Sequence, residues 1–311
     1  MTASQSSGKL RAASGRSVAA DKAATVVLWG LGGFVLLLLG LIILHFVIAS
    51  VGVMSLSFIF GDPSESAVGG VGPLLFNSVY MLVLAMLIAV PLGLLAGIYM
   101  SEYAADNRVT ATIRFAEEAI SSVPSIVVGL FGLIAFVNLT HWGFTALAGV
   151  LALTLFNLPL MARLSEQALQ AVPQEERSAS LALGATKWQT IRHVVVPLAI
   201  PGIVTGIILT AGRVFGEAAV LLFTAGVGTP IHYNFFNLNV FDDSSPWSPF
   251  RHTATTLSVY IWKTNSEGTH AAQISQQIGD GASALLLATV LIFNLGSRFL
   301  GRILTRRLTA A

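Results

Sequence analysis

Long apolar segments recur along the chain and are separated by shorter polar stretches. A membrane-spanning α-helix needs about 20 predominantly apolar residues. Segments of about that length lie at residues 24–49, 72–100, 115–138, 144–162, 199–225 and 281–301. The pattern therefore predicts an all-α, polytopic membrane protein with six transmembrane helices.

The composition agrees with a membrane protein. Of the 311 residues, 54% are hydrophobic and 10% are charged, whereas an ordinary soluble domain has about 25% charged residues. The chain has no cysteine, which excludes disulfides, cysteine-ligated zinc and thiol catalysis. Its six histidines show no H-x-x-x-H or H-E-x-x-H spacing, and no glycine-rich stretch has the pattern of a phosphate-binding loop. We therefore expect no metal site, no cofactor, no nucleotide site and no catalytic residue in this chain.

Basic residues gather at one side of the predicted bundle. Of the 17 Lys and Arg residues, only Arg251 and Lys263 fall on the other side, and Arg213 falls inside a span. The remainder lie in the N-terminal tail, between the second and third spans, between the fourth and fifth spans, and after the sixth span. The positive-inside rule then places both termini in the cytoplasm.

The tails and loops divide the chain further. Residues 1–22 are rich in Ser, Ala, Lys and Arg without a hydrophobic period, which predicts a disordered cytoplasmic tail. Residues 23–71 hold the first transmembrane helix and an outer loop. Residues 72–304 hold the five other helices, and residues 305–311 form a short cytoplasmic C-terminal tail.

The long loop between the fourth and fifth spans has a helical pattern of its own. Residues 174–197 read QEERSASLALGATKWQTIRHVVVP, with two acids in the first turn of a helix and Gly184 at its end. Thr186 is a suitable N-cap for a second helix, and Pro197 marks the return toward the membrane. We call these two predicted helices and their glycine turn the knob (residues 174–197). The pattern alone fits a protruding knob and a simple connector equally well.

Two charged residues interrupt the fifth span. The stretch LTAGRVFGEAAVLLFTAG, residues 209–226, contains Arg213 and Glu217. If this span is one helix, Arg213 lies about 20 Å along it at 1.5 Å per residue, near the middle of a bilayer core about 30 Å thick. Its side chain does not reach an interface from that depth, so its charge must be met inside the protein.

Glu217 follows Arg213 by one helical turn and lies on the same face, so an ion pair is one interpretation. A pair by itself seldom recovers more than the cost of burying both charges, which favours a functional site over a purely structural one. Arg163, at the cytoplasmic end of the fourth span, is either a second positive point on the same route or an anchor that sets topology.

The knob resembles the coupling motif of ABC importer permeases, which reads E-A-A, three residues, G, nine residues and I-x-L-P. Aligned on Gly184, the motif falls on Ser178, Ala179, Ser180, Val194, Val196 and Pro197. The distance from glycine to proline matches, while Ser replaces the leading Glu and one Ala, and Val replaces Ile and Leu. The resemblance implies that this loop docks in a groove of a separate ATPase subunit, through Ala179, Gly184, Ala185 and Pro197.

Four further stretches resemble phosphate importer permeases of the PstA type, in order and at similar spacing. They are residues 77–104, 122–133, 158–169 and 202–226, and the resemblance covers approximately residues 72–304. That family commonly has G-E-T-A-P after the intramembrane arginine, whereas this chain has G-E-A-A-V. The planar fork of arginine matches phosphate oxygens, and a carboxylate accepts a proton from protonated phosphate. The resemblance therefore implies a phosphate pathway that includes Arg213, Glu217 and Arg163.

The resemblance also implies that residues 72–304 form the permease domain of an ATP-driven phosphate importer in the cytoplasmic (inner) membrane of a bacterium or archaeon. The implied partners are phosphate, a second permease of the PstC type, two ATPases of the PstB type, an extracytoplasmic phosphate-binding protein and the lipid membrane, with no nucleic acid. ATP hydrolysis would reside in the ATPases, so this chain is not expected to be an enzyme. The alternatives are an ABC permease for another oxyanion or small solute and an ion-coupled secondary transporter that works alone.

Overall fold

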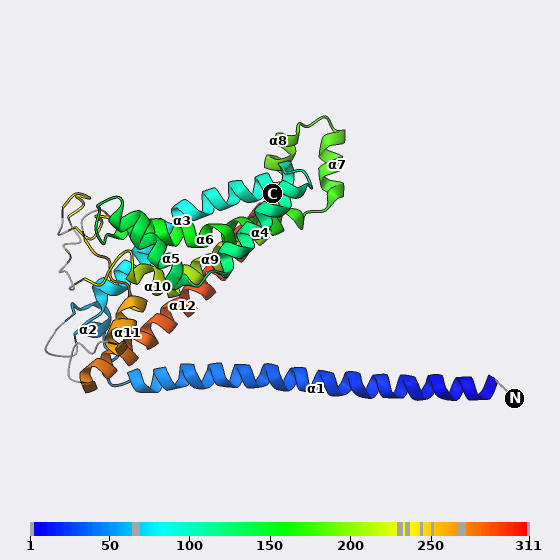
Figure 1. The fold of residues 1–311 in the computed structure, drawn as a ribbon, viewed down its shortest axis with the longest axis horizontal. Coiled ribbons are helices and arrows are strands. Elements are labelled where there is room, and N and C mark those ends of the chain that lie inside the picture. Colours follow the sequence, from blue (N-terminus) through cyan, green and yellow to red (C-terminus); the bar gives the residue numbers. More distant parts are fainter. Residues whose placement is uncertain are drawn as a thin grey trace. The chain divides into compact units, whose positions relative to one another are not determined.

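The structure is a computed structural model, shown in Figure 1. It describes residues 3–63, 69–228, 233, 237–242, 245–249, 252–266 and 272–309. All regular secondary structure within these ranges is helical, which confirms the predicted all-α fold class. The chain divides into two compact units, Met1–Val51 and Gly52–Ala311.

The first unit is one long helix, α1 (Ala3–Ser50). Its part from Ala20 to Ser50 is 31 residues long and includes an 18-residue stretch with a mean hydropathy of 2.8, which agrees with the first predicted span. The helix begins before that span, so residues 3–22 are helical here and do not form the expected disordered tail. Ala, Lys and Arg are good helix formers, and extending an existing helix costs far less than nucleating a new one.

The second unit contains the other described helices, some of them short π-helical turns labelled η. In chain order they are α2 (Leu56–Phe60), α3 (Gly72–Ile98), η1 (Tyr99–Tyr103), α4 (Arg108–Ser122), α5 (Ser125–Gly132), η2 (Leu133–Asn138), α6 (Ala146–Gln170), α7 (Gln174–Ala182), α8 (Lys187–Thr190), η3 (Ile191–Val195), α9 (Val196–Gly216), α10 (Ala219–Leu222), α11 (Leu257–Ser266) and α12 (Ala272–Thr309). Four of its segments are long and apolar enough to cross a membrane, namely Gly72–Tyr103, Ala146–Gln170, Lys187–Gly216 and Gln276–Phe299. These segments confirm the second, fourth, fifth and sixth predicted spans, with shifted ends.

The last helix is longer than the sequence pattern indicates. We expected the sixth span to end near residue 301, but α12 continues to Thr309. Residues 305–309 of the expected C-terminal tail are therefore helical, and residues 310 and 311 lie outside the described part of the chain.

The third predicted span, residues 115–138, is not one straight helix. Helix α4 ends at Ser122, α5 begins at Ser125, and the two are bent by 96° relative to each other. The break falls at Val123, which is extended because a residue that precedes a proline avoids the helical conformation, and Pro124 follows it. Within the described residues, five helices therefore suit a membrane span, or six if the bent pair counts as one span.

Close contact between helices α3, α6 and α9 forms the core of the second unit. Gly93 and Gly97 of α3 face α6 so closely that a Cβ added at Gly97 would lie 2.5 Å from the Cβ of Ser165. On the other side of α6, Gly202 and Gly206 of α9 face Ala168 and Leu164 in the same way. Glycine allows two helix backbones to approach this closely. The G-x-x-x-G pairs in the sequence therefore act as packing contacts.

The second unit has two distinct ends. In Figure 1, α7 and α8 project from one end of the bundle, and α2 and α11 lie at the opposite end. Helices α3 and α6 run in the same direction and end beside the knob, whereas α9 starts there and runs back. The knob is therefore attached to the ends of three core helices.

We expect Gly97→Ala to destabilise the protein, because the new Cβ would also lie 2.8 Å from the backbone nitrogen of Glu166, which side-chain movement cannot relieve. Overpacking of this kind costs about 1–3 kcal/mol. The midpoint of thermal unfolding in detergent should fall for this variant. Gly296→Ala is the matched control, since a Cβ at Gly296 of α12 meets nothing within 4 Å. Equal midpoints for the two variants would contradict the close contact.

Candidate functional site

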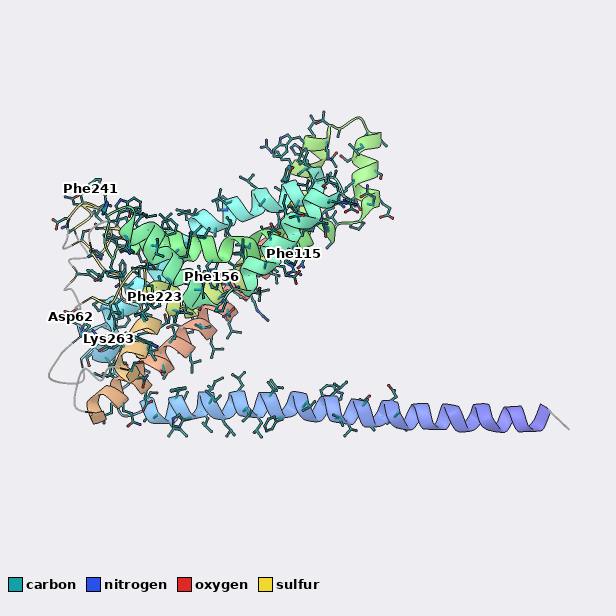
Figure 2. All side chains as sticks on the ribbon, viewed as in Figure 1. Asp62, Phe115, Phe156, Phe223, Phe241 and Lys263 are labelled. Atoms are coloured by element: carbon teal, nitrogen blue, oxygen red, sulfur yellow. The ribbon has the colours of Figure 1, made fainter. Side chains whose placement is uncertain are left out.

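Arg213 lies in the last turn of α9, with its guanidinium carbon 4.2 Å from the centre of the Phe156 ring of α6. Phe156 is 2% exposed and lies inside the bundle in Figure 2, whereas Phe115 of α4 is 72% exposed. A cation above an aromatic ring gains between about 0.5 and 2 kcal/mol, depending on how far both are desolvated. Among the described residues, no carboxylate forms an ion pair with Arg213. The half-buried guanidinium therefore remains available to an anion.

The depth of Arg213 follows from the packing of α9 against α6. The two helices are antiparallel, with Gly202 beside Ala168 near one end and Arg213 over Phe156 further along. Phe156 is the eleventh of the 25 residues of α6, a helix long enough to cross a membrane. Arg213 therefore lies level with the middle of α6, which supports the depth expected from the sequence.

Glu217 does not occupy the position that the sequence suggested. We expected it one turn beyond Arg213 on the same helix face, but α9 ends at Gly216 and Glu217 is extended, with φ −73° and ψ 124°. Its carboxylate accepts a hydrogen bond from the backbone N–H of Val220 at 3.4 Å, which caps the start of α10. Since helix geometry no longer aligns the two side chains, the expected intrahelical ion pair does not form.

A buried polar segment, residues 252–258, lies beside this helix break. Ser258 donates its hydroxyl to the backbone carbonyl of Glu217 at 2.9 Å. Asn77 near the start of α3 donates to the carbonyl of Thr255 at 3.0 Å, and Ser78 accepts from the N–H of Leu257 at 2.8 Å. Thr255, Leu257 and Ser258 are all buried. The segment therefore joins the beginning of α3 to the end of α9.

Tyr233 adds a further contact at this end. Its hydroxyl donates to Oδ1 of Asn77 at 3.0 Å, so Asn77 binds two partners with its two amide atoms. Burial raises the pKa of the Tyr233 hydroxyl. The phenol therefore stays protonated at neutral pH and keeps donating this bond.

Arg163 lies on the same face of α6 as Phe156, because seven residues make almost two full helical turns. It is about 10 Å further along α6 at 1.5 Å per residue. Its guanidinium lies 3.7 Å from the carboxylate of Glu118, and both side chains are well exposed, at 46% and 68%. An exposed pair of this kind contributes little stability, at most about 1 kcal/mol. Arg163 is therefore held only loosely.

A cavity of about 330 Å³ lies next to Arg163, between α4 and the end of α6 that carries the knob. It is lined by Arg114, Glu117, Glu118, Arg163, Glu166, Gln167 and Gln170. Arg114 is bound more tightly than Arg163, since it lies 2.8 Å from the carboxylate of Glu166, which is 8% exposed. Of these two arginines, Arg163 is the one more easily released to an incoming anion.

The knob has the turn that its sequence predicts. Helix α7 ends before Gly184, whose φ is +86°, a left-handed conformation that favours glycine. Thr186 then caps α8, accepting a hydrogen bond from the N–H of Gln189 while the Gln189 side chain accepts from the N–H of Thr186. This reciprocal capping box fixes the start of α8.

The second half of the knob continues directly into the fifth span. Pro197, which the sequence places at the return toward the membrane, lies within one continuous helix from Lys187 to Gly216, formed by α8, η3 and α9. A proline inside an α-helix clashes with the carbonyl four residues earlier. The π-helical turn η3, directly before α9, widens the helix where this carbonyl lies, so Pro197 fits without a break. Movement at Lys187 is therefore connected to Arg213 by one continuous helix.

The surface of the knob is exposed and partly apolar. Leu183 is 89% exposed and Trp188 is 52% exposed. Of the residues expected to contact a partner, Ala179 and Gly184 are exposed, whereas Ala185 and Pro197 are half-buried. Large apolar side chains left in the open at a turn are typical of a surface that a partner covers.

The family of the chain follows from comparison with known proteins. Residues 89–310 match the family described as "Binding-protein-dependent transport system inner membrane component". The chain belongs to this family of ABC importer permeases.

Individual relatives match this permease over long stretches of sequence. The "Probable ABC transporter permease protein YqgI" of Bacillus subtilis (strain 168) is 50% identical over 262 residues, which cover 83% of this chain and 88% of that protein. The "Phosphate transport system permease protein PstA 1" of Mycobacterium tuberculosis (strain CDC 1551 / Oshkosh) is 36% identical over 243 residues, or 78% of this chain and 74% of that protein. A PstA permease of Xylella fastidiosa (strain 9a5c) is 40% identical over 163 residues, covering 52% and 57% of the two chains.

Solved structures agree with the fold of the permease. An inward-facing MetNI methionine ABC transporter matches with a TM-score of 0.55 at 20% identity, over 75% of this chain and 93% of that chain. A bacterial ABC transporter for the polysaccharide alginate matches with a TM-score of 0.52 at 14% identity, over 74% and 78%. At these identities the matches establish the shared fold alone.

Membership of the family defines the role of the chain. It is a multi-pass permease subunit of a binding-protein-dependent ABC importer in a bacterial inner membrane. Such permeases work with a partner permease, ATPase subunits and a binding protein, and ATP is hydrolysed in the ATPase subunits. The permease is therefore not itself an enzyme, as the sequence predicts.

Sequence reasoning missed two parts of the permease site. Phe156 is one of many apolar residues in the fourth span, and no local signal marks it as the partner of Arg213. The buried polar segment does have a signal in the sequence. The run TATTLS at residues 253–258 places four hydroxyl residues close together in a mostly apolar chain. Its position beside Glu217 depends on contacts between distant parts of the chain.

Proposed function

We propose that this permease forms, with a second permease of the PstC type, the transmembrane pathway of a phosphate importer. Two ATPases of the PstB type would drive it, and an extracytoplasmic phosphate-binding protein would deliver phosphate to the end that carries the buried polar segment. The PstA relatives at 36% and 40% identity support phosphate as the substrate. The observation that carries the proposal is Arg213, a cation level with the middle of the bundle and faced by an aromatic ring.

Arg213 suits an oxyanion because its guanidinium is planar, permanently charged and able to donate two parallel hydrogen bonds. The ring of Phe156 orients the guanidinium but does not neutralise it, whereas a carboxylate in the same place would neutralise it. A phosphate ion that enters therefore supplies the missing negative charge. Arg163 lies two turns further along the same face of α6 and serves as the next positive point on the route.

The knob would be the part on which the ATPases act. Its exposed Leu183 and Trp188 offer an apolar contact surface. Through the continuous helix from Lys187 to Gly216, a displacement of the knob reaches Arg213. Ala179, Gly184, Ala185 and Pro197 are the knob residues that we assign to the ATPase contact or to the backbone that shapes it.

We expect Arg213→Gln to lower phosphate uptake by at least about tenfold, because a charged hydrogen bond contributes about 1.5–3 kcal/mol. Uptake of labelled phosphate by cells that carry the variant, with membrane insertion checked, measures this effect. Arg298→Gln is the matched control, since Arg298 is an exposed arginine of α12. Normal uptake by the Arg213 variant would contradict the site, and stronger competition by sulfate or molybdate than by unlabelled phosphate would favour another oxyanion.

Glu217→Gln tests whether the carboxylate contributes to selectivity. Sulfate carries no proton at neutral pH, so a carboxylate near the pathway repels it, whereas protonated phosphate can donate a hydrogen bond to that carboxylate. We expect inhibition of phosphate uptake by sulfate to become stronger by about tenfold, the change that 1.4 kcal/mol of lost repulsion produces. Asp106→Asn removes an exposed carboxylate elsewhere and should leave the inhibition constant unchanged. An unchanged constant for Glu217→Gln would restrict Glu217 to capping α10.

Gly184→Val should uncouple ATP hydrolysis from transport, because a β-branched residue is strained at a φ of +86° and would reshape the knob. Gly143→Val is a closely matched control, since Gly143 also has a positive φ, of +71°, and also meets nothing within 4 Å at its Cβ position. The two variants impose similar strain, but only Gly184 lies in the knob. The ratio of phosphate imported to ATP hydrolysed should fall for Gly184→Val alone. Equal ratios would count against ATPase docking at the knob.

A further inference from the structure

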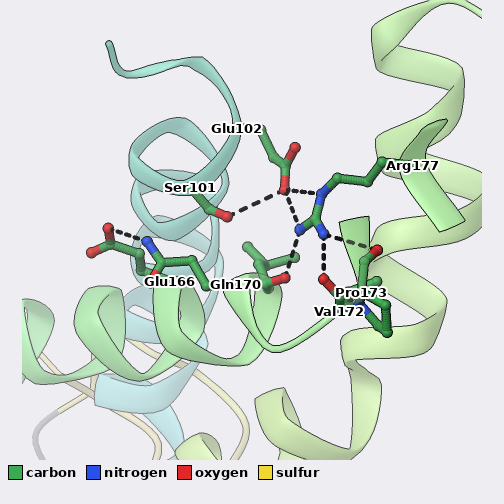
Figure 3. A network of polar contacts seen from close by, with 8 residues as sticks. Ser101, Glu102, Glu166, Gln170, Val172, Pro173 and Arg177 are labelled. Carbon is green, nitrogen blue, oxygen red and sulfur yellow. Dashed lines mark hydrogen bonds and ion pairs between the residues drawn. The ribbon is translucent and has the colours of Figure 1, made fainter. Parts of the chain in front are cut away.

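The end of α3 is bound to the knob by a buried ion pair. Nη2 of Arg177 in α7 lies 2.9 Å from Oε1 of Glu102 in η1, and Nε of Arg177 donates to the same oxygen at 3.3 Å (Figure 3). The two side chains are only 11% and 9% exposed. Ser101 donates a further hydrogen bond to this carboxylate oxygen at 3.2 Å. Glu102 is therefore held in place by both α7 and its own helix.

Arg177 also joins α7 to the end of α6. It donates to the backbone carbonyl of Leu169 at 2.7 Å and to the carbonyls of Val172 and Pro173 (Figure 3). The Leu169 carbonyl lies in the last turn of α6, where backbone carbonyls carry partial negative charge. Val172 and Pro173 belong to the link between α6 and α7. One guanidinium thus binds these three carbonyls and the Glu102 carboxylate together.

Tyr103, the residue after Glu102, contacts the second helix of the knob, α8. Nζ of Lys187, the first residue of α8, lies 4.9 Å from the centre of the Tyr103 ring. Glu102 and Tyr103 are neighbours in η1, and each contacts one of the two knob helices. Two independent contacts therefore connect the end of α3 to the two sides of the glycine turn.

A cavity of about 720 Å³ lies beside the Glu102–Arg177 contact, between the knob and the bundle. Its lining includes Glu102, Arg177, Leu181, Lys187 and Ile191. Helices α6 and α9 are joined to the knob by the chain itself, whereas α3 continues from η1 into α4 and reaches the knob through side chains. Burying an ion pair stabilises a fold less well than apolar packing would, so stability alone is a poor reason for Glu102 and Arg177.

The far end of α3 contacts the buried polar segment. Asn77 and Ser78 bind Thr255 and Leu257, and Ser258 of the same segment binds the carbonyl of Glu217. A single helix therefore contacts the knob at one end and, at the other end, the segment beside the helix break. This connection is separate from the direct one through α9.

We propose that Glu102 and Tyr103 transmit movement of the knob to α3, and that α3 passes it on to the buried polar segment. This inference rests on the proposed docking of ATPases at the knob. Glu102 and Tyr103 act as positioning residues, which fix α3 to both knob helices so that the two move together. The polar segment then rearranges when the ATPases close, in step with the Arg213 end of α9.

The test uses the complete importer and a single cysteine. Because the chain has no cysteine of its own, a thiol introduced by Thr253→Cys, at a half-exposed position of the polar segment, is labelled selectively within this subunit. The labelling rate is measured with and without ATP and vanadate, which traps closed ATPases. This readout does not depend on which solute is transported.

We expect nucleotide to change the labelling rate in the Thr253→Cys importer, and Glu102→Ala combined with Tyr103→Leu to reduce that change by about fivefold or more. Tyr103→Phe keeps the ring and should retain the change. Asp106→Asn should retain it as well, since it removes an exposed acid outside the knob. The amount of ATPase that copurifies should be the same for all variants.

An unaltered response in the double variant would overturn the transmission role. Loss of bound ATPase from that variant would also overturn it, by showing that the contacts serve docking. No response in the Thr253→Cys importer with its ATPases bound would exclude the polar segment as the end point. Failure of the unaltered chain to bind ATPases would instead contradict the function proposed for the knob, and with it the transmission.

Discussion

The close backbone contact of α6 with α3 and α9 is the constraint on which the rest of the structure depends. Glycines at Gly97 and Gly202 let the three helices approach until neighbouring backbone and side-chain atoms leave no room for a Cβ. This contact fixes the register, and register decides which side chains meet. Since each residue of a helix turns by about 100°, a shift of one residue would carry Phe156 away from Arg213.

The end of α9 explains how a charge at this depth is tolerated without an ion pair. Arg213 lies in the last turn, where the partial negative charge of the helix C-terminus favours a cation. The ring of Phe156 adds a second favourable contact. The break at Gly216 also turns Glu217 out of the helix and engages its carboxylate with α10. The same break therefore stabilises the cation and keeps it from being neutralised within the helix.

Local sequence signals predicted the local features correctly. Gly184 and Thr186 fix the turn of the knob through their own backbone and side-chain bonds, so a short stretch of sequence contains the information. Pro124 explains the break in the third span by an equally local effect, because the residue before a proline avoids the helical conformation, whereas the apolar pattern alone predicted one uninterrupted span. The misplacement of Glu217 has a different origin. The apolar sequence continues to residue 225, which predicted one helix through Glu217. The end of α9 at Gly216 is instead favoured by contacts with distant residues, such as the hydrogen bond from Ser258 to the Glu217 carbonyl.

The three core helices differ in how they are connected to the knob, and this difference shapes how the permease moves. Helices α6 and α9 enter and leave the knob covalently, so any rotation of the knob acts on both. Helix α3 contacts the knob itself through Glu102 and Tyr103, and it is also packed on α6 through Gly93 and Gly97. Tight packing prevents α3 from sliding independently, so a force applied at η1 passes along its length. Because α3 reaches Asn77 at its other end, both sides of the Arg213 region respond to one event at the knob.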